Sequence, residues 1–203
     1  MLSSLPPIDQ QLRESGYSLI AGVDEAGRGP LAGPVFAAAV ILPPSNGLPD
    51  TMDSKRLSPT RREALYDEIL SVAVAWHVSS IENQVIDRIN ILQATLKAMV
   101  EAVRNLSDTP EMILVDGSHT PFVDSHSRAL TKGDGISQSI GAASVLAKVL
   151  RDRAMAKYHE EYPQYGFARH KGYGTREHLD AIARHGPCPI HRRSFAGVRE
   201  YVK

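Results

Sequence analysis

Cysteine is almost absent from this chain: Cys188 is the single cysteine in 203 residues. One cysteine excludes an intramolecular disulfide and a cysteine-rich zinc site, and it fits a reducing compartment. No apolar run approaches the 18 residues that a membrane-spanning helix needs. The first residues also lack the basic segment and apolar core of a signal peptide. We therefore expect a cytoplasmic protein with no membrane association.

Net charge and aromatic residues are also in short supply. The formal net charge is zero and aromatic residues make up 6%, which disfavours a stacking platform for single-stranded nucleic acid. The charge is unevenly spread, however. Residues 1–150 hold 12 Lys/Arg against 17 Asp/Glu, whereas residues 151–203 hold 11 against 6. This asymmetry indicates a polyanionic partner, with an ordinary solvated basic surface as the alternative.

The length suits one domain, and the order of apolar segments predicts an α/β fold. We expect strands at five places: residues 18–23, 34–42, 72–81, 112–115 and, as an edge strand, 126–131. Helices are expected from Ser58-Pro59 onward, over 84–106, over about 136–161, and from Thr175 to near His185. The helix over 84–106 carries an apolar stripe of Val85, Ile86, Ile89, Leu92, Leu96, Met99, Val103 and Leu106. Residues 1–17 are interpreted as a loose lead-in.

Acidic residues stand at the ends of the predicted core elements. Asp24-Glu25 ends the first strand, Asp116 ends the fourth, and Asp134 lies between two glycines at a helix start. A buried carboxylate without a partner is costly, and few basic residues lie nearby in the sequence. A divalent cation with oxygen ligands is the natural compensator. The pattern therefore predicts a metal site.

The geometry of such a site follows from strand alternation. Asp24 and Glu25 point to opposite faces of a strand, so they converge only if the strand ends there. Asp24 and Asp116 lie side by side if the first and fourth strands are neighbours. Each residue also has a plainer explanation: Asp134 as a helix-start acid, Asp116 as part of a turn, and Asp24-Glu25 as an ion-pair partner of Arg28.

A glycine-rich loop follows the first acidic pair. Gly27-Arg28-Gly29-Pro30 combines two glycines, which allow close backbone approach to a ligand, with a fixed positive charge. The spacing matches neither a Walker A motif nor a dinucleotide fingerprint. A tight turn between strands is the structural alternative.

Several motifs together resemble the ribonuclease HII family. The most specific is Gly-Val-Asp-Glu-Ala-Gly-Arg-Gly-Pro-Leu-Ala-Gly-Pro-Val at residues 22–35. The others are Asp53-Ser54-Lys55, Val115-Asp116-Gly117, Lys132-Gly133-Asp134 with residues 139–152, His170-Lys171-Gly172-Tyr173-Gly174-Thr175, and His191-Arg192-Arg193-Ser194-Phe195. They occur in the family's order over roughly residues 18–196.

The resemblance implies a fold and an activity. The fold is ribonuclease H-like: a mixed β-sheet flanked by helices over residues 18–161, with a C-terminal helical portion, residues 162–203, packed on it to bind substrate. The implied activity is metal-dependent endonucleolytic hydrolysis of the RNA strand of RNA–DNA hybrids. It includes cutting 5′ to single ribonucleotides in duplex DNA, which leaves 3′-hydroxyl and 5′-phosphate ends. We expect the protein to act as a monomer.

The resemblance also assigns roles to residues. Asp24, Glu25, Asp116 and Asp134 correspond to the acidic tetrad of the family, which would hold two Mn²⁺ or Mg²⁺ ions at the scissile phosphate. Gly27, Arg28 and Gly29 correspond to the loop that senses the ribose 2′-hydroxyl. Tyr173 corresponds to the tyrosine that packs on the following sugar. Lys55, Lys171 and Arg192 are predicted to contact the substrate.

Two other functions fit parts of the pattern. One is a phosphatase with Asp24 or Asp116 as nucleophile, and the other is a nucleic-acid-binding module with a structural metal. The basic C-terminal part favours a polymeric substrate over a small phosphate ester. That part also holds five of the eight histidines, whose spacing forms no zinc motif. We expect most of them on the surface or near phosphates, without a metal role.

Overall fold

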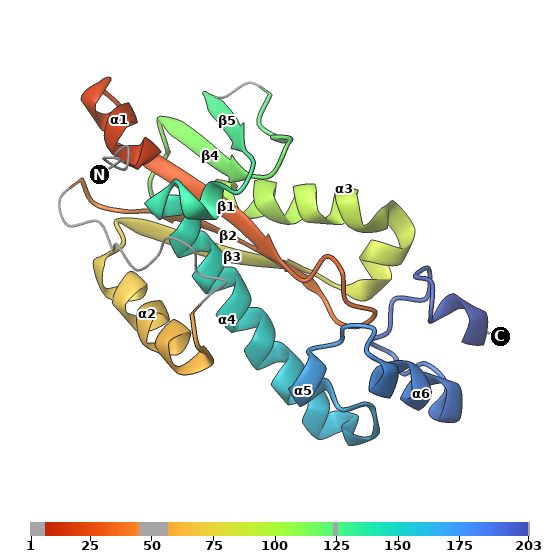
Figure 1. The fold of residues 1–203 in the computed structure, drawn as a ribbon. Helices are drawn as coiled ribbons and strands as arrows, with labels where there is room; N and C mark the ends of the chain where they lie inside the picture. Colours follow the sequence, from red (N-terminus) through yellow and green to blue (C-terminus); the bar gives the residue numbers. More distant parts are fainter. Residues whose placement is uncertain (1–6, 45–56, 124–125, 203) are drawn as a thin grey trace, which may run out of the picture.

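A five-stranded mixed sheet forms the centre of the protein (Figure 1). The structure is a computed structural model that describes residues 7–44, 57–123 and 126–202. The sheet order is β3-β2-β1-β4-β5. The strands are β1 (Ile20–Ala26), β2 (Val35–Ile41), β3 (Ala75–Ile81), β4 (Met112–Asp116) and β5 (Ser127–Leu130). The first three are antiparallel, whereas β4 is parallel to β1 and β5 is parallel to β4.

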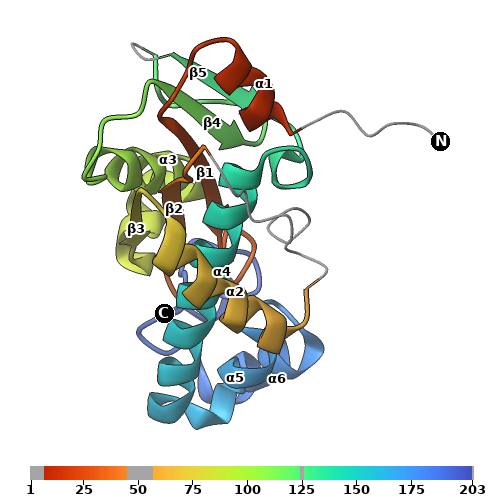
Figure 2. The same ribbon diagram turned by 90° about the vertical axis from the view of Figure 1, so that its left-hand side faces the viewer.

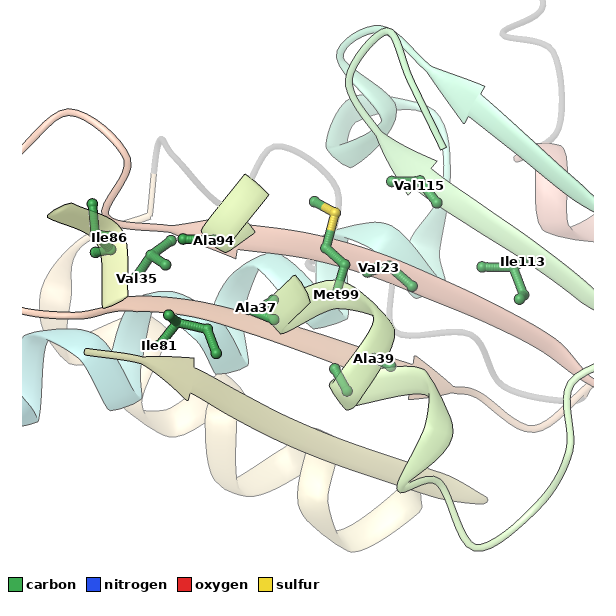
Figure 3. Packing of buried hydrophobic residues seen from close by; sticks show 12 residues of the cluster. Val23, Val35, Ala37, Ala39, Ile81, Ile86, Ala94, Met99, Ile113 and Val115 are labelled. Atoms are coloured by element: carbon green, nitrogen blue, oxygen red, sulfur yellow. The ribbon is translucent and has the colours of Figure 1, made fainter. Parts of the chain in front are cut away.

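Helices cover both faces of this sheet, which explains the nearly continuous apolar runs of β1 and β2. One face packs on α3 (Asn83–Arg104), and Figure 3 shows side chains of this cluster, including Val23, Ala37 and Met99. The other face packs on α4 (Gln138–Glu161) and α2 (Pro59–Val72). The predicted α/β fold with a mixed sheet flanked by helices is confirmed.

Helix α4 lies unusually close to the central strand. A Cβ atom built on Gly22 of β1 would lie 2.0 Å from the carbonyl carbon of Ser139, so only glycine fits there. The Ser, Gly and Ala residues in the first half of α4 are buried against the sheet. This contact fixes α4 relative to β1.

The N-terminal lead-in contains a helix that the sequence did not predict. Helix α1 (Ile8–Glu14) carries Asp9, which is 1% exposed. The Asp9 carboxylate accepts hydrogen bonds from the amides of Gln138 and Ser139, and Ser137 accepts one from Ile140. Two side chains thus cap the start of α4, at the positive end of its dipole.

Helix α3 is not the straight helix that the apolar stripe predicts. It bends at Asn90, where φ is +66° and the side chain accepts a hydrogen bond from the amide of Gln93. The bend changes which residues face the sheet. Leu92, predicted to be in the stripe, is 45% exposed, whereas Ala94 and Ala98 are buried.

The start of α2 agrees with the prediction from the sequence, whereas the start of β3 does not. Ser58 caps α2 and Pro59 occupies its first turn, as predicted. Because α2 continues to Val72, β3 begins at Ala75, three residues later than predicted.

The C-terminal elements gather at the far end of α4, away from α1 and β5 (Figure 2). They are η4 (Pro163–Tyr165), α5 (Phe167–His170), α6 (Arg176–His185) and η5 (Arg199–Tyr201), where η denotes a 3₁₀ helix. Their apolar side chains share a cluster with Met155 of α4 and with Leu31 and Ala32. This portion therefore packs on both α4 and the glycine-rich loop. Among the described helices, none is both long and apolar enough to cross a membrane.

Candidate active site

Two carboxylates from neighbouring strands face helix α4. Strands β1 and β4 are parallel with Val23 opposite Val115, and both valines pack toward α3. The next residue of each strand, Asp24 and Asp116, therefore points to the α4 side. The condition that we set for bringing Asp24 and Asp116 together, that their strands be neighbours, is met.

Glu25 reaches the same place in a way that we did not expect. Strand β1 does not end at Asp24 but continues to Ala26, paired there with Phe36 of β2. The pairing with β4 stops at Val23, so Glu25 lies beyond the end of β4. Both Asp24 and Glu25 border one cavity although the strand does not turn between them.

Asp24 is a buried acid with an unsatisfied oxygen. Its side chain is 2% exposed, and its Oδ1 accepts a hydrogen bond from the Glu25 amide at 2.7 Å. Its Oδ2 has no hydrogen-bond partner among the residues that the structure describes. Burial raises the pKa of Asp24 well above its ordinary value, and the charges of Glu25 and Asp116 raise it further. A cation at this point would stabilise the ionised carboxylate and so oppose the rise in pKa.

The other two acids lie beside this group. The amide of Gly133 donates a 2.7 Å hydrogen bond to Asp116 Oδ1, which brings η3 (Gly133–Gly135) against the end of β4. Asp134 in η3 is 6% exposed and does not border the cavity itself. Asp134 lies in the first turn of η3, whereas α4 itself begins at Gln138 with Ser137 and Asp9 as its caps.

A cavity of about 370 Å³ joins the acids to the glycine-rich loop. The cavity is lined by Asp24, Glu25, Ala26, Gly27, Arg28, Gly29, Arg62, Asp116, Ser144, Lys148, Arg151 and Tyr173. Arg62, Ser144, Lys148 and Arg151 were not predicted as site residues. The signal for three of them was their spacing, since residues 144, 148 and 151 follow one face of a helix.

The expected ion pair between the acids and Arg28 is present but weak. Arg28 Nη1 lies 3.3 Å from Glu25 Oε1, and the Arg28 side chain is 50% exposed. Such an exposed pair contributes about 0–1 kcal/mol to stability. It does not involve the buried Asp24, whose raised pKa is opposed by hydrogen bonds from Ser144 and the Glu25 amide.

The two glycines of the loop differ in how well their positions would accept a larger residue. Gly27 has φ of +101°, and a Cβ there would lie 2.1 Å from Nε of Arg151. Gly29 has no such strain, and its Cβ would make an ordinary 3.4 Å contact with the ring of Tyr173. The loop and Tyr173 are therefore side by side, and Tyr173 remains 47% exposed.

Comparison with known proteins agrees with this geometry. A family model described as Ribonuclease HII matches residues 21–198. The chain belongs to the ribonuclease HII family.

Individual relatives show how far the likeness extends. A curated ribonuclease HII of Geotalea daltonii is 55% identical over 98% of this chain and 93% of its own length. That of Geobacter sulfurreducens is 57% identical over 92% of this chain and 86% of its own. The crystal structure of ribonuclease H2 from Pyrococcus horikoshii OT3 has a TM-score of 0.77 at 28% identity and covers 90% of this chain and 96% of its own. Membership in the ribonuclease HII family assigns the chain a ribonuclease H endonuclease activity, in place of the phosphatase and binding-module hypotheses.

Within this ribonuclease HII family member, Arg192 does not lie where we predicted. It is fully buried and cannot reach a phosphate at the surface. Its guanidinium donates to the carbonyl oxygens of Gly27 (2.6 Å), Arg28 (2.9 Å), Pro30 (2.8 Å) and Gly33 (3.0 Å). Burial, and secondarily Arg151, lowers the pKa of Arg192 to about 9. The prediction of a direct substrate contact is wrong for Arg192, which instead holds the loop from inside.

The two predicted lysines have different outcomes. Lys171 is half-buried, and its Nζ donates to the carbonyl of Ala168. It borders a second cavity that shares Arg62 with the first. Its contact with substrate stays a prediction, and Lys55 lies outside the described residues.

The donor set fits a hard divalent ion in an open site. Among residues 7–44, 57–123 and 126–202, no three His, Cys, Asp or Glu side chains are grouped so that they could hold an ion by themselves. Mg²⁺ is commonly held by one or two carboxylates together with waters and substrate phosphates, so a closed cage is not required. The partnerless oxygen of Asp24 is the place where such an ion fits best.

Proposed function

We propose that this protein hydrolyses the RNA strand of RNA–DNA hybrids and cuts 5′ to a single ribonucleotide embedded in duplex DNA. The products carry 3′-hydroxyl and 5′-phosphate ends. One observation supports this most strongly. The unsatisfied carboxylate oxygen of Asp24 borders the same cavity as the Gly27–Gly29 loop and Tyr173. The residues proposed to cleave the strand and those proposed to recognise the ribose therefore line the same cavity.

Asp24, Glu25 and Asp116, with Asp134 beside them, are the residues that would hold two Mn²⁺ or Mg²⁺ ions. When bound, such ions supply a nucleophilic water of lowered pKa and offset negative charge at the phosphate. The carboxylates then position the ions and need not transfer protons.

Basic side chains on the cavity wall would bind the nucleic-acid backbone. Lys148 and Arg62 border the cavity, and Lys148 is steadied by Asp152 at 2.6 Å. Contacts of this kind fix the register of a duplex without reading its sequence. The substrate partners that we propose are hybrids and ribonucleotide-containing duplexes, and the monomeric state stays a prediction.

The loop and Tyr173 would distinguish ribose from deoxyribose. A 2′-hydroxyl both donates and accepts hydrogen bonds, which a rigid peptide edge can match. Arg192 fixes the orientation of the peptide groups at Gly27 and Arg28. The exposed ring of Tyr173 offers an apolar face to the next sugar, which favours a deoxyribose there. This arrangement favours a step from RNA to DNA.

The test uses three end-labelled duplexes: all-DNA, one embedded ribonucleotide, and a long hybrid. We expect one cut 5′ to the single ribonucleotide and no cut in the all-DNA duplex. Tyr173→Ala should lose more activity on the single-ribonucleotide duplex than on the hybrid. Tyr201→Ala is the matched control, because Tyr201 is similarly exposed at 44% but does not border the cavity.

Three outcomes would count against this proposal. Equal cutting of the all-DNA duplex would remove the role of the 2′-hydroxyl. Cleavage confined to long RNA tracts, or equal effects of the two tyrosine variants, would remove the role of Tyr173.

A further inference from the structure

Two histidines form a buried pair beneath Tyr173. His178 of α6 and His191 are both fully buried, unlike the other three histidines of this region, and so are exceptions to the surface location that we expected for most of them. Their Nε2 atoms are 3.0 Å apart. Neither borders the cavity, and the proposed reaction does not use them.

The backbone around the pair fixes where each proton lies. The carbonyl of Tyr173 only accepts, so Nδ1 of His178, 2.9 Å away, must carry a proton. The Cys188 amide (2.9 Å) and thiol (3.0 Å) can both donate to Nδ1 of His191, whereas the Cys188 carbonyl lies farther away, at 3.3 Å. The two shorter contacts favour a bare Nδ1. A neutral His191 then carries its proton on Nε2 and donates it to the bare Nε2 of His178.

This assignment is a one-way chain of hydrogen bonds from Cys188 through both imidazoles to Tyr173. Both rings have to be neutral, because an added proton would set two N–H groups face to face at 3.0 Å. The apolar and aromatic surroundings agree: the ring of Tyr165 lies 4.9 Å from that of His191, and the ring of His170 stacks on His178 at 4.6 Å.

The far end of the chain is anchored beside the glycine-rich loop. The backbone of His191 forms an antiparallel bridge with Ala32, and its carbonyl accepts a hydrogen bond from Asn83. The Leu31 amide also donates to the carbonyl of Gly172, next to Tyr173. His191 is therefore held by the loop at its backbone and directed at Tyr173 by its side chain.

We infer that His191, acting through His178, is a positioning residue for Tyr173 that sets where its ring lies relative to the loop at Gly29. The inference rests on the proposed role of Tyr173 in substrate choice. Two donors hold the Tyr173 carbonyl: His178 Nδ1 and the Thr175 amide. Loss of the Nε2–Nε2 hydrogen bond removes the contact that fixes the His178 ring and so loosens the first of these donors. Selection of the single ribonucleotide then weakens, while cleavage chemistry is kept.

The first experiment needs no variant and no substrate. Two-bond ¹⁵N–¹H correlation spectra of the full chain with ¹⁵N-labelled histidine, at pH 7, report the tautomer of each ring. We expect His178 as the Nδ1–H form and His191 as the Nε2–H form, both neutral. The reverse tautomers, or a protonated ring in either residue, would overturn the inference whatever the activity.

The second experiment compares two substitutions of His191. His191→Gln places an amide donor near the position of Nε2 and keeps a donor to His178. His191→Asn places its amide near Nδ1 and keeps only the contact to Cys188. We expect His191→Asn to lose roughly tenfold on the single-ribonucleotide duplex, as misplacement of a recognition group does, but to stay within about twofold on the long hybrid. His191→Gln should retain most of the selectivity.

Combining His191→Asn with Tyr173→Ala distinguishes positioning from a general loss of structure. If His191 acts through Tyr173, the double variant should lose no more selectivity than Tyr173→Ala alone. Multiplied effects, or equal losses by both His191 variants on both substrates, would overturn the inference. Failure of the proposed function looks different: the wild type itself would cut all-DNA and ribonucleotide duplexes alike.

Discussion

Asp24 and Arg192 are two buried charged groups with opposite environments. Arg192 has no exposed surface and satisfies four carbonyl oxygens of the loop. Asp24 is equally buried, yet one of its oxygens has no partner among the described residues. Burial raises the pKa of Asp24 and lowers the pKa of Arg192, so in both residues it favours the neutral form. A saturated buried charge indicates a structural role, whereas an unsaturated one indicates a site for a ligand.

Asp24→Asn tests the buried group that lacks a hydrogen-bond partner, and we expect it to have the largest effect. We expect cleavage to fall by more than about 100-fold, because the ligand itself is lost rather than an outer partner. In chelator the variant should be more stable, since it removes repulsion with Glu25 and Asp116. Each 1 kcal/mol corresponds to about 2–4 °C in Tm for a chain of this size.

The measurements are turnover at saturating Mg²⁺ and Tm with and without chelator. Asp180→Asn, an exposed acid on α6 that is 3.8 Å from Arg176, is the control and should change neither. Near-normal turnover of Asp24→Asn would exclude Asp24 as a metal ligand.

Arg192→Lys tests the buried group whose hydrogen bonds to the loop are complete. One ammonium cannot replace the forked donors that meet four carbonyls, so we expect a loss of about 3 kcal/mol of unfolding free energy, a drop in Tm of roughly 6–12 °C. Denaturant unfolding measures the loss. Binding of hybrid by the folded variant should keep its salt dependence, because Arg192 touches no phosphate. A shallower slope would restore our original prediction of a phosphate contact.

Arg62→Gln should have a smaller effect on binding. Arg62 borders both cavities, so it is placed to neutralise a phosphate. The slope of log K against log salt should fall by about 0.9 for one lost contact. Arg176→Gln is the matched control, because the Arg176 side chain is 94% exposed and borders neither cavity. Equal slopes for the wild type and Arg62→Gln would remove this contact.

A further effect concerns pH and the buried histidines. Burial lowers the pKa of His178 and of His191 to about 4. Below their ordinary pKa near 6.5 the unfolded chain binds protons that the folded chain refuses, so stability should fall from pH 6.5 toward pH 4. His170, Tyr165 and Cys188 face the same pair.

Asp24 opposes this trend in the absence of metal. Its raised pKa makes the folded state more stable when the acid is protonated, and this gain is lost as pH rises through the folded pKa. Tm should therefore be measured in the Asp24→Asn background, where the decline toward pH 4 should be steeper. A flat profile there would show that the histidines are not buried neutral.

Much of the fold could be predicted from the sequence because each element carries its own local signal. The apolar runs of β1 and β2 and the cap at Ser58 predicted elements that the structure contains. The bend at Asn90 could not be predicted, because the apolar spacing continues through it. Helix α1 was missed because its key contact, from Asp9 to the start of α4, joins residues about 130 positions apart.

The candidate site was predicted in part for the same reason. The positions of Asp24, Asp116 and Gly27 followed from strand ends and glycines. Burial of Arg192 and His191 could not be inferred, because charge and polarity in a sequence suggest exposure. Only tertiary packing shows that their donors are consumed inside the protein.

The placement of β1 has a consequence for how the protein comes into being. This first strand is central, its antiparallel neighbour β2 comes next in the chain, and β3 then pairs with β2. Its parallel neighbour β4 pairs residue 20 with residue 112, a closure across most of the preceding chain. Local hairpins form faster than long-range parallel pairs. Asp24 and Asp116 therefore meet late in folding. Pulse-labelled hydrogen exchange should show amides of β2 and β3 protected before those of β4, so a half-folded chain holds no assembled acidic centre.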